Sequence, residues 1–264
     1  MKKLSLLLAV MALLFADIAL AASAAVTSVT GTAQVQTGTS APRTLRLGDE
    51  VSQGDTVVTG ANSALVLKFD DGQVAALTAN SRMIISSYTY NPATESGNVL
   101  LSLVTGGMRA ITGLIGRRSP NQVAYRAATA TIGIRGTDAT MATDGDNVVV
   151  TVSEGSVSYT FQGVTLVLTA GEAVFSRPGQ ATIRGPIADV VRNLPDNFRN
   201  AVNAATGGAL DAAVRAAGPG QQRQGGDNQQ GQQGNGQGQS GQGGGQQGGG
   251  GQGGGGGGGN ASGS

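Results

Sequence analysis

The stretch VVVTVSEGSVSYTFQGVTLVL, residues 148–168, decides the fold class. Apolar and small polar side chains alternate on both sides of Glu154-Gly155, and the alternation resumes after Gln162-Gly163. A two-residue period is typical of strands with one buried face, and glycine-containing dipeptides between such runs indicate turns. We therefore expect three consecutive strands here, with the chain reversing at 154–155 and again at 162–163.

The same pattern extends toward the N-terminus. Leu65, Leu67 and Phe69 alternate along one strand, Asp70-Asp71-Gly72 provides a hairpin turn, and residues 74–85 supply the return side. Turn signals recur roughly every 8–12 residues, a spacing typical of all-β folds. The sequence thus predicts an all-β domain over residues 25–185, built as a short-stranded antiparallel sandwich or a solenoid-like array.

Composition restricts both the core and the chemistry. Aromatic residues make up only 3% of the 264 residues, and tryptophan is absent, so the core must be built from Val, Ile, Leu and Ala. The chain contains no cysteine, which excludes disulfides, and no histidine. Without histidine there is no Ser-His-Asp or Cys-His nucleophile, and the usual zinc, copper and haem ligands are missing.

The first 24 residues have the three parts of a secretory signal peptide. Lys2 and Lys3 precede an apolar run over residues 4–20, and small residues follow at 21–25. We expect cleavage after Ala24, with Ala21 as the alternative, and hence a periplasmic or secreted protein of a Gram-negative type bacterium. No cysteine follows the run to carry a lipid anchor.

The mature chain is expected to be electrically balanced. The precursor has 17 basic and 16 acidic residues, and loss of the signal peptide leaves 15 of each. A neutral chain offers no electrostatic basis for binding nucleic acid or an anionic membrane. After the signal peptide, no later segment is expected to span a membrane.

Residues 186–217 change to helical spacing. One apolar stripe comprises Ile187, Val190, Val191 and Leu194, a second comprises Phe198, Ala201, Val202 and Ala205, and Leu210, Ala213 and Val214 suggest a third turn. Asp196 follows Pro195 and is expected to cap the second helix. These helices are expected to pack on the sheet, with a partner-binding amphipathic segment as the alternative.

Residues 218–264 are almost entirely Gly and Gln and are predicted to be disordered.

Acidic residues beside glycines raise two further possibilities. Pairs such as Gly54-Asp55 and Glu154-Gly155 suit either a calcium site or ordinary turn chemistry, and their scatter favours turns. Asp70 and Asp71 are candidates for a glycosidase pair, but neighbours in an exposed turn are poorly placed for that role. We predict no enzyme activity, no metal and no cofactor.

Five segments, in order, resemble the FecR domain. They begin with Gly48-Asp49 and residues 54–60, continue with residues 69–74, 105–109 and 128–138 (ATATIGIRGTD), and end with residues 150–157. The resemblance covers residues 26–177. The motif residues, which we expect to be structural, are Gly54, Asp55, Asp71, Gly72, Gly133, Arg135, Gly136, Thr137, Asp138, Glu154 and Gly155.

The resemblance implies a periplasmic regulatory domain. In the best-known family members this domain lies between a TonB-dependent receptor and a membrane helix leading to a cytoplasmic segment that controls a sigma factor. This chain departs from that plan, because we expect a cleavable signal in place of the cytoplasmic and transmembrane parts. The resemblance therefore implies the fold and a binding function, but not the complete signalling role.

Arg135 is the charged residue that the sequence singles out. It lies in the apolar run of residues 132–134, before Gly136. We expect it to be partly buried and paired with Asp138 or Glu154, so that Arg135→Ala would destabilise the fold. The alternative is an exposed arginine that binds a partner's carboxylate or a glycan.

These observations favour a non-enzymatic binding module that contacts another envelope or extracellular protein, or a glycan, through strand edges and loops. Envelope signalling is one setting for such a module. The alternative is a structural β protein of the cell surface or extracellular matrix, to which the Gly/Gln tail would contribute. The oligomeric state is left open by the sequence.

Overall fold

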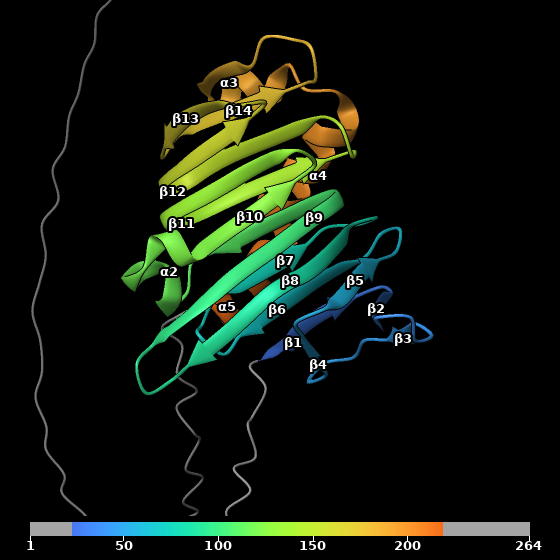
Figure 1. The fold of residues 1–264 in the computed structure, drawn as a ribbon. Helices are drawn as coiled ribbons and strands as arrows, with labels where there is room; N and C mark the ends of the chain where they lie inside the picture. Colours follow the sequence, from blue (N-terminus) through green and yellow to red (C-terminus); the bar gives the residue numbers. More distant parts are fainter. Residues whose placement is uncertain (1–22, 219–264) are drawn as a thin grey trace, which may run out of the picture. The chain divides into compact units, whose positions relative to one another are not determined.

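The computed structural model describes residues 23–218, so the predicted signal peptide and nearly all of the Gly/Gln tail lie outside the described residues. Figure 1 shows strands followed by short helices. The N-terminal strands are β1 (Ser23–Thr30), β2 (Ala33–Thr37), β3 (Arg43–Thr44), β4 (Glu50–Ser52), β5 (Asp55–Thr59), β6 (Ala64–Phe69), β7 (Val74–Leu77), β8 (Arg82–Asn91) and β9 (Ser96–Ile111). Helix α2 (Leu114–Arg118) and the 3-10 turn η1 (Pro120–Gln122) follow β9.

The second half contains the longest pairing in the fold. Its strands are β10 (Val123–Ala127), β11 (Ala130–Thr143), β12 (Val148–Phe161), β13 (Val164–Thr169), β14 (Glu172–Ser176) and β15 (Ile183–Pro186). Three helices end the described chain: α3 (Ile187–Arg192), α4 (Asp196–Thr206) and α5 (Gly208–Ala217). The prediction of an all-β fold followed by short helices is confirmed.

Hydrogen bonding runs through one sheet of 15 strands, which is folded into two layers. Strands β9, β11 and β12 take part in both layers. The first half of β9 pairs with β8 and β10, whereas its second half pairs with β7 and β11. β12 likewise pairs with β14 through its first half and with β13 through its second half. All pairs are antiparallel except β9–β10, which is parallel.

One apolar core lies between the two layers. Its members include Leu65, Leu67 and Met141 from one layer and Ile132 and Tyr159 from the other. The aliphatic composition is as predicted, and one aromatic pair joins the layers: the rings of Phe69 (β6) and Tyr88 (β8) meet edge to face with centroids 4.8 Å apart. This arrangement matches the sandwich interpretation rather than the solenoid-like one.

The predicted reversal at Glu154-Gly155 is wrong, because β12 continues through it as a single strand. The strand bulges there instead, and its register with β11 shifts at the same place. Gly155 has φ +74°, and a Cβ atom on it would lie 2.0 Å from the carbonyl oxygen of Gly136. Two backbones cross closely at this point, and the bulge lets β12 pass from one layer to the other. The second predicted turn, at 162–163, is present and connects β12 to β13.

The helices cover the outer face of one layer only. Val190, Leu194, Phe198 and Val202 pack on Ala142, Val149, Ala173 and Phe175, and α5 packs through Val214 and Ala217 on Val66, Val74 and Ala76. The expectation that this segment packs on the sheet is confirmed.

The capping prediction is wrong: Asp196 is the first helical residue, where it pairs with Arg199, and Pro195 occupies the cap position. Among residues 23–218, none of the helices has the length and apolar character needed to cross a bilayer.

Strand β1 bears on where a signal peptide would be cut. Ala24 is fully buried and pairs with Val51 and Phe69, and the amide of Ser23 donates to the carboxylate of Asp70 at 2.7 Å. Cleavage after Ala24 would remove both residues from the sheet, whereas cleavage after Ala21 would leave them in place.

We therefore predict that the signal peptide is cleaved after Ala21, the second of the two sites that the sequence pattern allows. The mature chain would then begin at Ala22. N-terminal sequencing or intact mass of the exported protein tests this directly. A mature chain beginning at Ala25 would contradict it.

Candidate functional site

Two of the FecR-like segments meet on neighbouring strands. Arg109 lies near the end of β9, and Asp138 lies past the bulge of β11. In the register between these strands Arg109 is opposite Thr140 and Asp138 is opposite Ile111, so the two charged residues are diagonal neighbours on one face. This is the outer face of the layer that the helices cover.

Arg109 forms a bidentate ion pair with Asp138. Its Nε donates to Oδ1 of Asp138 at 2.8 Å, and its Nη2 donates to Oδ2 at 2.6 Å. Both residues are only 8% exposed. A planar guanidinium and a carboxylate that share two hydrogen bonds form one of the stronger polar contacts available to a protein.

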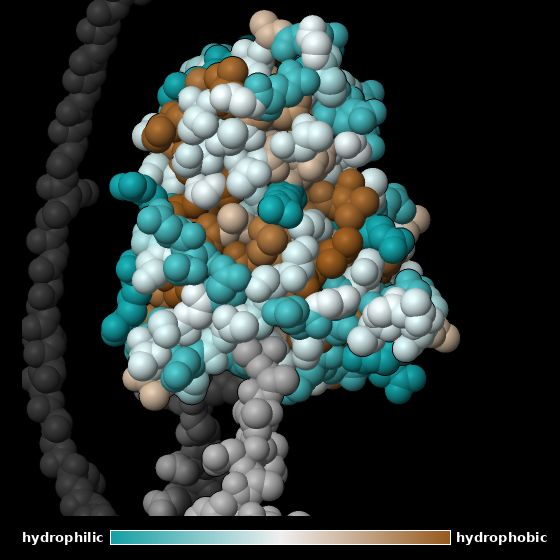
Figure 2. Space-filling view, in the orientation of Figure 1, coloured by the Kyte–Doolittle hydropathy of each residue, from teal (hydrophilic) through white to brown (hydrophobic). Residues whose placement is uncertain are grey.

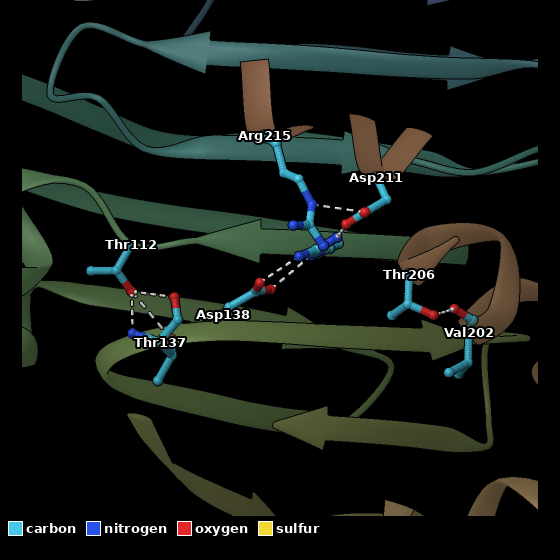
Figure 3. A network of polar contacts seen from close by, with 8 residues as sticks. Thr112, Thr137, Asp138, Val202, Thr206, Asp211 and Arg215 are labelled. Atoms are coloured by element: carbon cyan, nitrogen blue, oxygen red, sulfur yellow. Dashed lines mark hydrogen bonds and ion pairs between the residues drawn. The ribbon is translucent and has the colours of Figure 1, made fainter. Parts of the chain in front are cut away.

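The third member of the network comes from α5. Nη1 of Arg109 donates to Oδ1 of Asp211 at 2.6 Å, and Arg215, one helical turn later, donates from Nε to Oδ2 at 2.8 Å. Figure 3 shows Asp138 and Asp211 reaching this network from β11 and α5. Asp211 is 102 residues from Arg109 in sequence, so the network fixes the last helix to the motif segments.

The electrostatics favour the charged forms of Arg109 and Asp211. Hydrogen bonding to Asp138, and then to Asp211, raises the pKa of Arg109 despite its burial. Hydrogen bonding from Arg109 is also the main reason why the pKa of Asp211 is lowered. A lowered carboxylate pKa stabilises the fold above the pKa of the unfolded chain, and this contribution is lost as pH falls through the folded-state value.

The prediction for Arg135 is wrong. Its side chain is exposed, and within residues 23–218 it forms no ion pair, because Asp138 is taken by Arg109. The bulge explains the difference: Gly136 has φ +56°, and the register between β11 and β12 shifts between Arg135 and Asp138. Arg135 therefore lies on the outer face of the uncovered layer, whereas Asp138 lies under the helices.

Thr137 holds the bulge in place. Its amide donates to the hydroxyl of Thr112 at 2.8 Å, and the Thr112 hydroxyl contacts the Thr137 carbonyl oxygen at 3.1 Å. Glu154 stands opposite Asp138 in the register, but its side chain is exposed. A Cβ on Gly133 would make only ordinary van der Waals contact, at 3.8 Å from the Cβ of Ser158. The RGTD segment (residues 135–138) therefore forms the backbone bulge as well as supplying the charged residues of the motif.

The remaining motif residues have local structural roles. Gly54 has φ +89°, and the carboxylate of Asp55 accepts hydrogen bonds from the Ser52 amide at 2.9 Å and from the Thr37 hydroxyl. Glu172, which is not a motif residue, likewise accepts a hydrogen bond from the Thr169 amide at 2.8 Å. These acids perform the turn chemistry that the sequence favours. Within the described range 23–218, no three acidic side chains are grouped to hold a metal ion.

Asp71 departs from its predicted exposure. It is 1% exposed, because Gly113 and the start of α2 cover the hairpin turn that Gly72 (φ +80°) closes. Its carboxylate accepts hydrogen bonds from the Gln73 amide at 3.1 Å and the Ile115 amide at 3.4 Å, and the Tyr88 hydroxyl lies 3.4 Å away. Burial raises the pKa of Asp71, and these hydrogen bonds oppose the shift only in part.

A cleft opens between α4 and the strands beneath it. It has a volume of about 560 Å³ and is lined by small and amide side chains, among them Asn80, Thr105, Thr143, Asn197 and Asn200. Asp144 is its acidic residue, and backbone and side-chain donors at residues 146–147 satisfy that carboxylate. The lining contains no pair of free carboxylates and no nucleophile with an adjacent base.

Comparison with protein families matches residues 55–158 to the family described as FecR protein. This chain contains a FecR domain. The matched range begins at Asp55 and includes both Arg109 and Asp138, so the ion pair lies inside the domain, whereas Asp211 lies beyond it. A search of curated proteins gives no match.

Two solved structures of a "putative anti-sigma factor" from Parabacteroides distasonis are similar to the chain, each at 14% sequence identity and a TM-score of 0.41. The structure at 1.65 Å resolution is matched over 50% of this chain and 59% of its own, and the one at 2.50 Å over 61% and 88%. The chain therefore spans less than two thirds of the first structure.

Replacing Arg109 tests the role of the network in the FecR domain. Arg109→Ala leaves Asp138 buried without a partner, and we expect the free energy of unfolding to fall by about 3–5 kcal/mol. Arg135→Ala, at an exposed position, should change it by no more than about 0.5 kcal/mol. Urea unfolding of both variants measures the difference. Equal effects at the two positions would contradict the assignment.

Asp71 provides a prediction about pH. Because its pKa is raised in the folded state, the stability it contributes is full below the unfolded-state value of 3.8 and is lost as pH rises through the folded value. Asp71→Asn should therefore gain stability relative to the unmodified protein as pH rises above the unfolded-state value of 3.8. Urea unfolding across this range measures the gain, and a constant difference between the two proteins would refute it.

Proposed function

We propose that this protein is a non-enzymatic FecR-domain binding module of the bacterial envelope, periplasmic or secreted, that contributes to envelope signalling by binding a partner. The FecR domain supplies the regulatory class. Location and partner binding are the further steps of the proposal, and the sequence pattern of an export signal supports the first of them.

The observation that carries the proposal is the division of charge between the two faces. Arg109, Asp138 and Asp211 satisfy one another beneath the helices. Arg126 and Arg135, in contrast, are exposed on the outer face of the uncovered layer and form no ion pair within residues 23–218. Charge that is buried and paired stabilises the domain, whereas charge that is exposed and free is available to a partner.

Arg126 and Arg135 lie on the same face of neighbouring strands. Arg126 of β10 is opposite Thr131 of β11, and Arg135 follows Thr131 on the same side. The register continues through Thr160 and Thr165 in one row and through Ser156 and Thr169 in another. The result is a regular surface of short hydroxyl side chains with two arginines.

This surface suits an acidic partner. Guanidinium groups form bidentate hydrogen bonds with carboxylates, and the surrounding hydroxyls both donate and accept. Figure 2 shows the uncovered side as a surface of mostly intermediate hydropathy with separate hydrophilic groups, rather than a single apolar patch. We infer that a protein segment bearing Asp or Glu side chains binds here.

An enzymatic role is not part of the proposal. The acidic residues that could serve in a carboxylate pair are engaged or separated, since Asp70 accepts the Ser23 amide at the surface and Asp71 is buried beneath α2. The chain also supplies no histidine or cysteine. Both facts favour binding over catalysis.

Charge reversal on the uncovered face tests the proposal. The double variant Arg126→Glu, Arg135→Glu should reduce the recovery of crosslinked partner from the native envelope by about ten-fold or more, through loss of two charge-assisted contacts. Arg192→Glu is the matched control, because Arg192 is an exposed arginine on α3, away from this face.

Crosslinking in the native cell followed by mass spectrometry identifies the partner and measures its yield. Unfolding measurements on all variants establish that the fold is retained. An equal loss of partner in the control, or an unchanged yield in the double variant, would refute this face as the binding surface.

A further inference from the structure

Strand β13 has an unusual edge. Four strands have a hydrogen-bonded neighbour on one side only among the described residues: β3, β4, β13 and β15. Natural edge strands are normally protected from pairing with other chains by shortness, charge or proline. β3 contains Arg43, β4 contains Glu50, and β15 contains Arg184 and Pro186.

β13 lacks each of these protections. It is the longest of the four edge strands, with six residues, and its sequence VTLVLT contains neither charge nor proline. Val164 and Val167 are 62% and 59% exposed, which makes them two of the five large hydrophobic side chains exposed in the described chain. Figure 2 shows hydrophobic surface at the upper left, where Figure 1 places β13.

Backbone groups on this edge point away from the protein. Thr169 donates its amide to the Glu172 carboxylate instead of to β12, so the pair Thr169–Ser156 is a non-hydrogen-bonded pair of the ladder. Such pairs alternate along an antiparallel ladder, so Val167–Ser158 and Thr165–Thr160 are of the same kind. The amides and carbonyls of Thr165 and Val167 therefore face outward, and no partner for them exists within residues 23–218.

We propose that β13 pairs with β13 of a second copy of this chain, antiparallel and centred on Leu166. A second copy of β13 offers an edge of the same kind: no charged or proline side chain opposes the pairing, and β13 is the edge strand of the described chain that lacks both. Self-association is not opposed by electrostatics, because the formal net charge is only +1 for the precursor.

The proposed register uses every free group on the edge. Thr165 of one copy stands opposite Val167 of the other, and the reverse, which gives about four backbone hydrogen bonds across the two-fold axis. Leu166 then stands opposite itself as a non-hydrogen-bonded pair, with Val164 opposite Leu168. In this pairing, side chains on the same face of the two β13 strands lie next to each other. The uncovered layers of the two copies therefore form one continuous sheet, with their apolar side chains side by side.

The chain offers a clean test, because it contains no cysteine. A non-hydrogen-bonded pair has Cα atoms about 4.5 Å apart, within the range of roughly 4.4–6.8 Å that a disulfide bridges. Leu166→Cys should therefore form a covalent dimer when the full chain is oxidised. Leu47→Cys is the control, because Leu47 is 70% exposed in a loop outside the interface.

Sedimentation velocity on the unmodified chain should show a reversible monomer–dimer equilibrium. Val167→Pro removes an outward amide without breaking a bond to β12, and by symmetry it removes two interchain hydrogen bonds. We expect the dimer to weaken by roughly ten- to a hundred-fold. Val167→Lys should also weaken it, whereas Leu47→Lys, the matched apolar-to-charged change, should not.

The circular dichroism spectrum of each variant reports whether it has folded. Monomer at all concentrations, equal crosslinking of the two cysteine variants, or a dimer that Val167→Pro leaves unchanged would each overturn the proposal. Crosslinking of Leu166→Cys to a different protein in the native cell would also overturn it, because the edge would then belong to another partner.

Discussion

The bidentate contact between Arg109 and Asp138 is the constraint on which the rest of the FecR domain depends. A guanidinium in a largely buried position must be neutralised and fully hydrogen-bonded, or the fold loses several kcal/mol. Asp138 meets two of its donors and Asp211 a third. The need to satisfy one arginine therefore sets the relation of β9 to β11, and it also sets where α5 lies on the sheet.

The bulge beside this ion pair separates structural charge from available charge. Gly136 and Gly155 allow the backbones of β11 and β12 to cross at close range, and both strands pass from one layer to the other there. Arg135 and Asp138 are three positions apart, yet one is exposed on the open layer and the other is buried beneath the helices. The bulge thus buries Asp138, whose ion pair stabilises the domain, and leaves Arg135 exposed to solvent.

Coverage of the sandwich is asymmetric, and this asymmetry locates the proposed contacts. Helices α3, α4 and α5 bury apolar side chains of one layer, whose outer face would otherwise be exposed. The outer face of the other layer is not covered by these helices, and around Arg126 and Arg135 it carries short hydroxyl side chains. Its last strand, β13, presents an apolar edge with free backbone groups. Binding of an acidic partner and pairing with a second copy would use different parts of this layer, its face and its edge.

The sequence by itself determined the all-β class, the aliphatic core, the hairpins at 70–72 and 162–163, and the amphipathic helices, because each follows from local periodicity and turn residues. It also indicated the FecR resemblance. Only the tertiary structure decided that Glu154-Gly155 is a bulge, that Asp71 is buried beneath α2, and that Asp138 pairs with Arg109 instead of Arg135. Periodicity shows which side chains share a face of a strand. It carries no information on which distant strand or helix covers that face, and the contact of Asp211 with Arg109, 102 residues away, is of that kind.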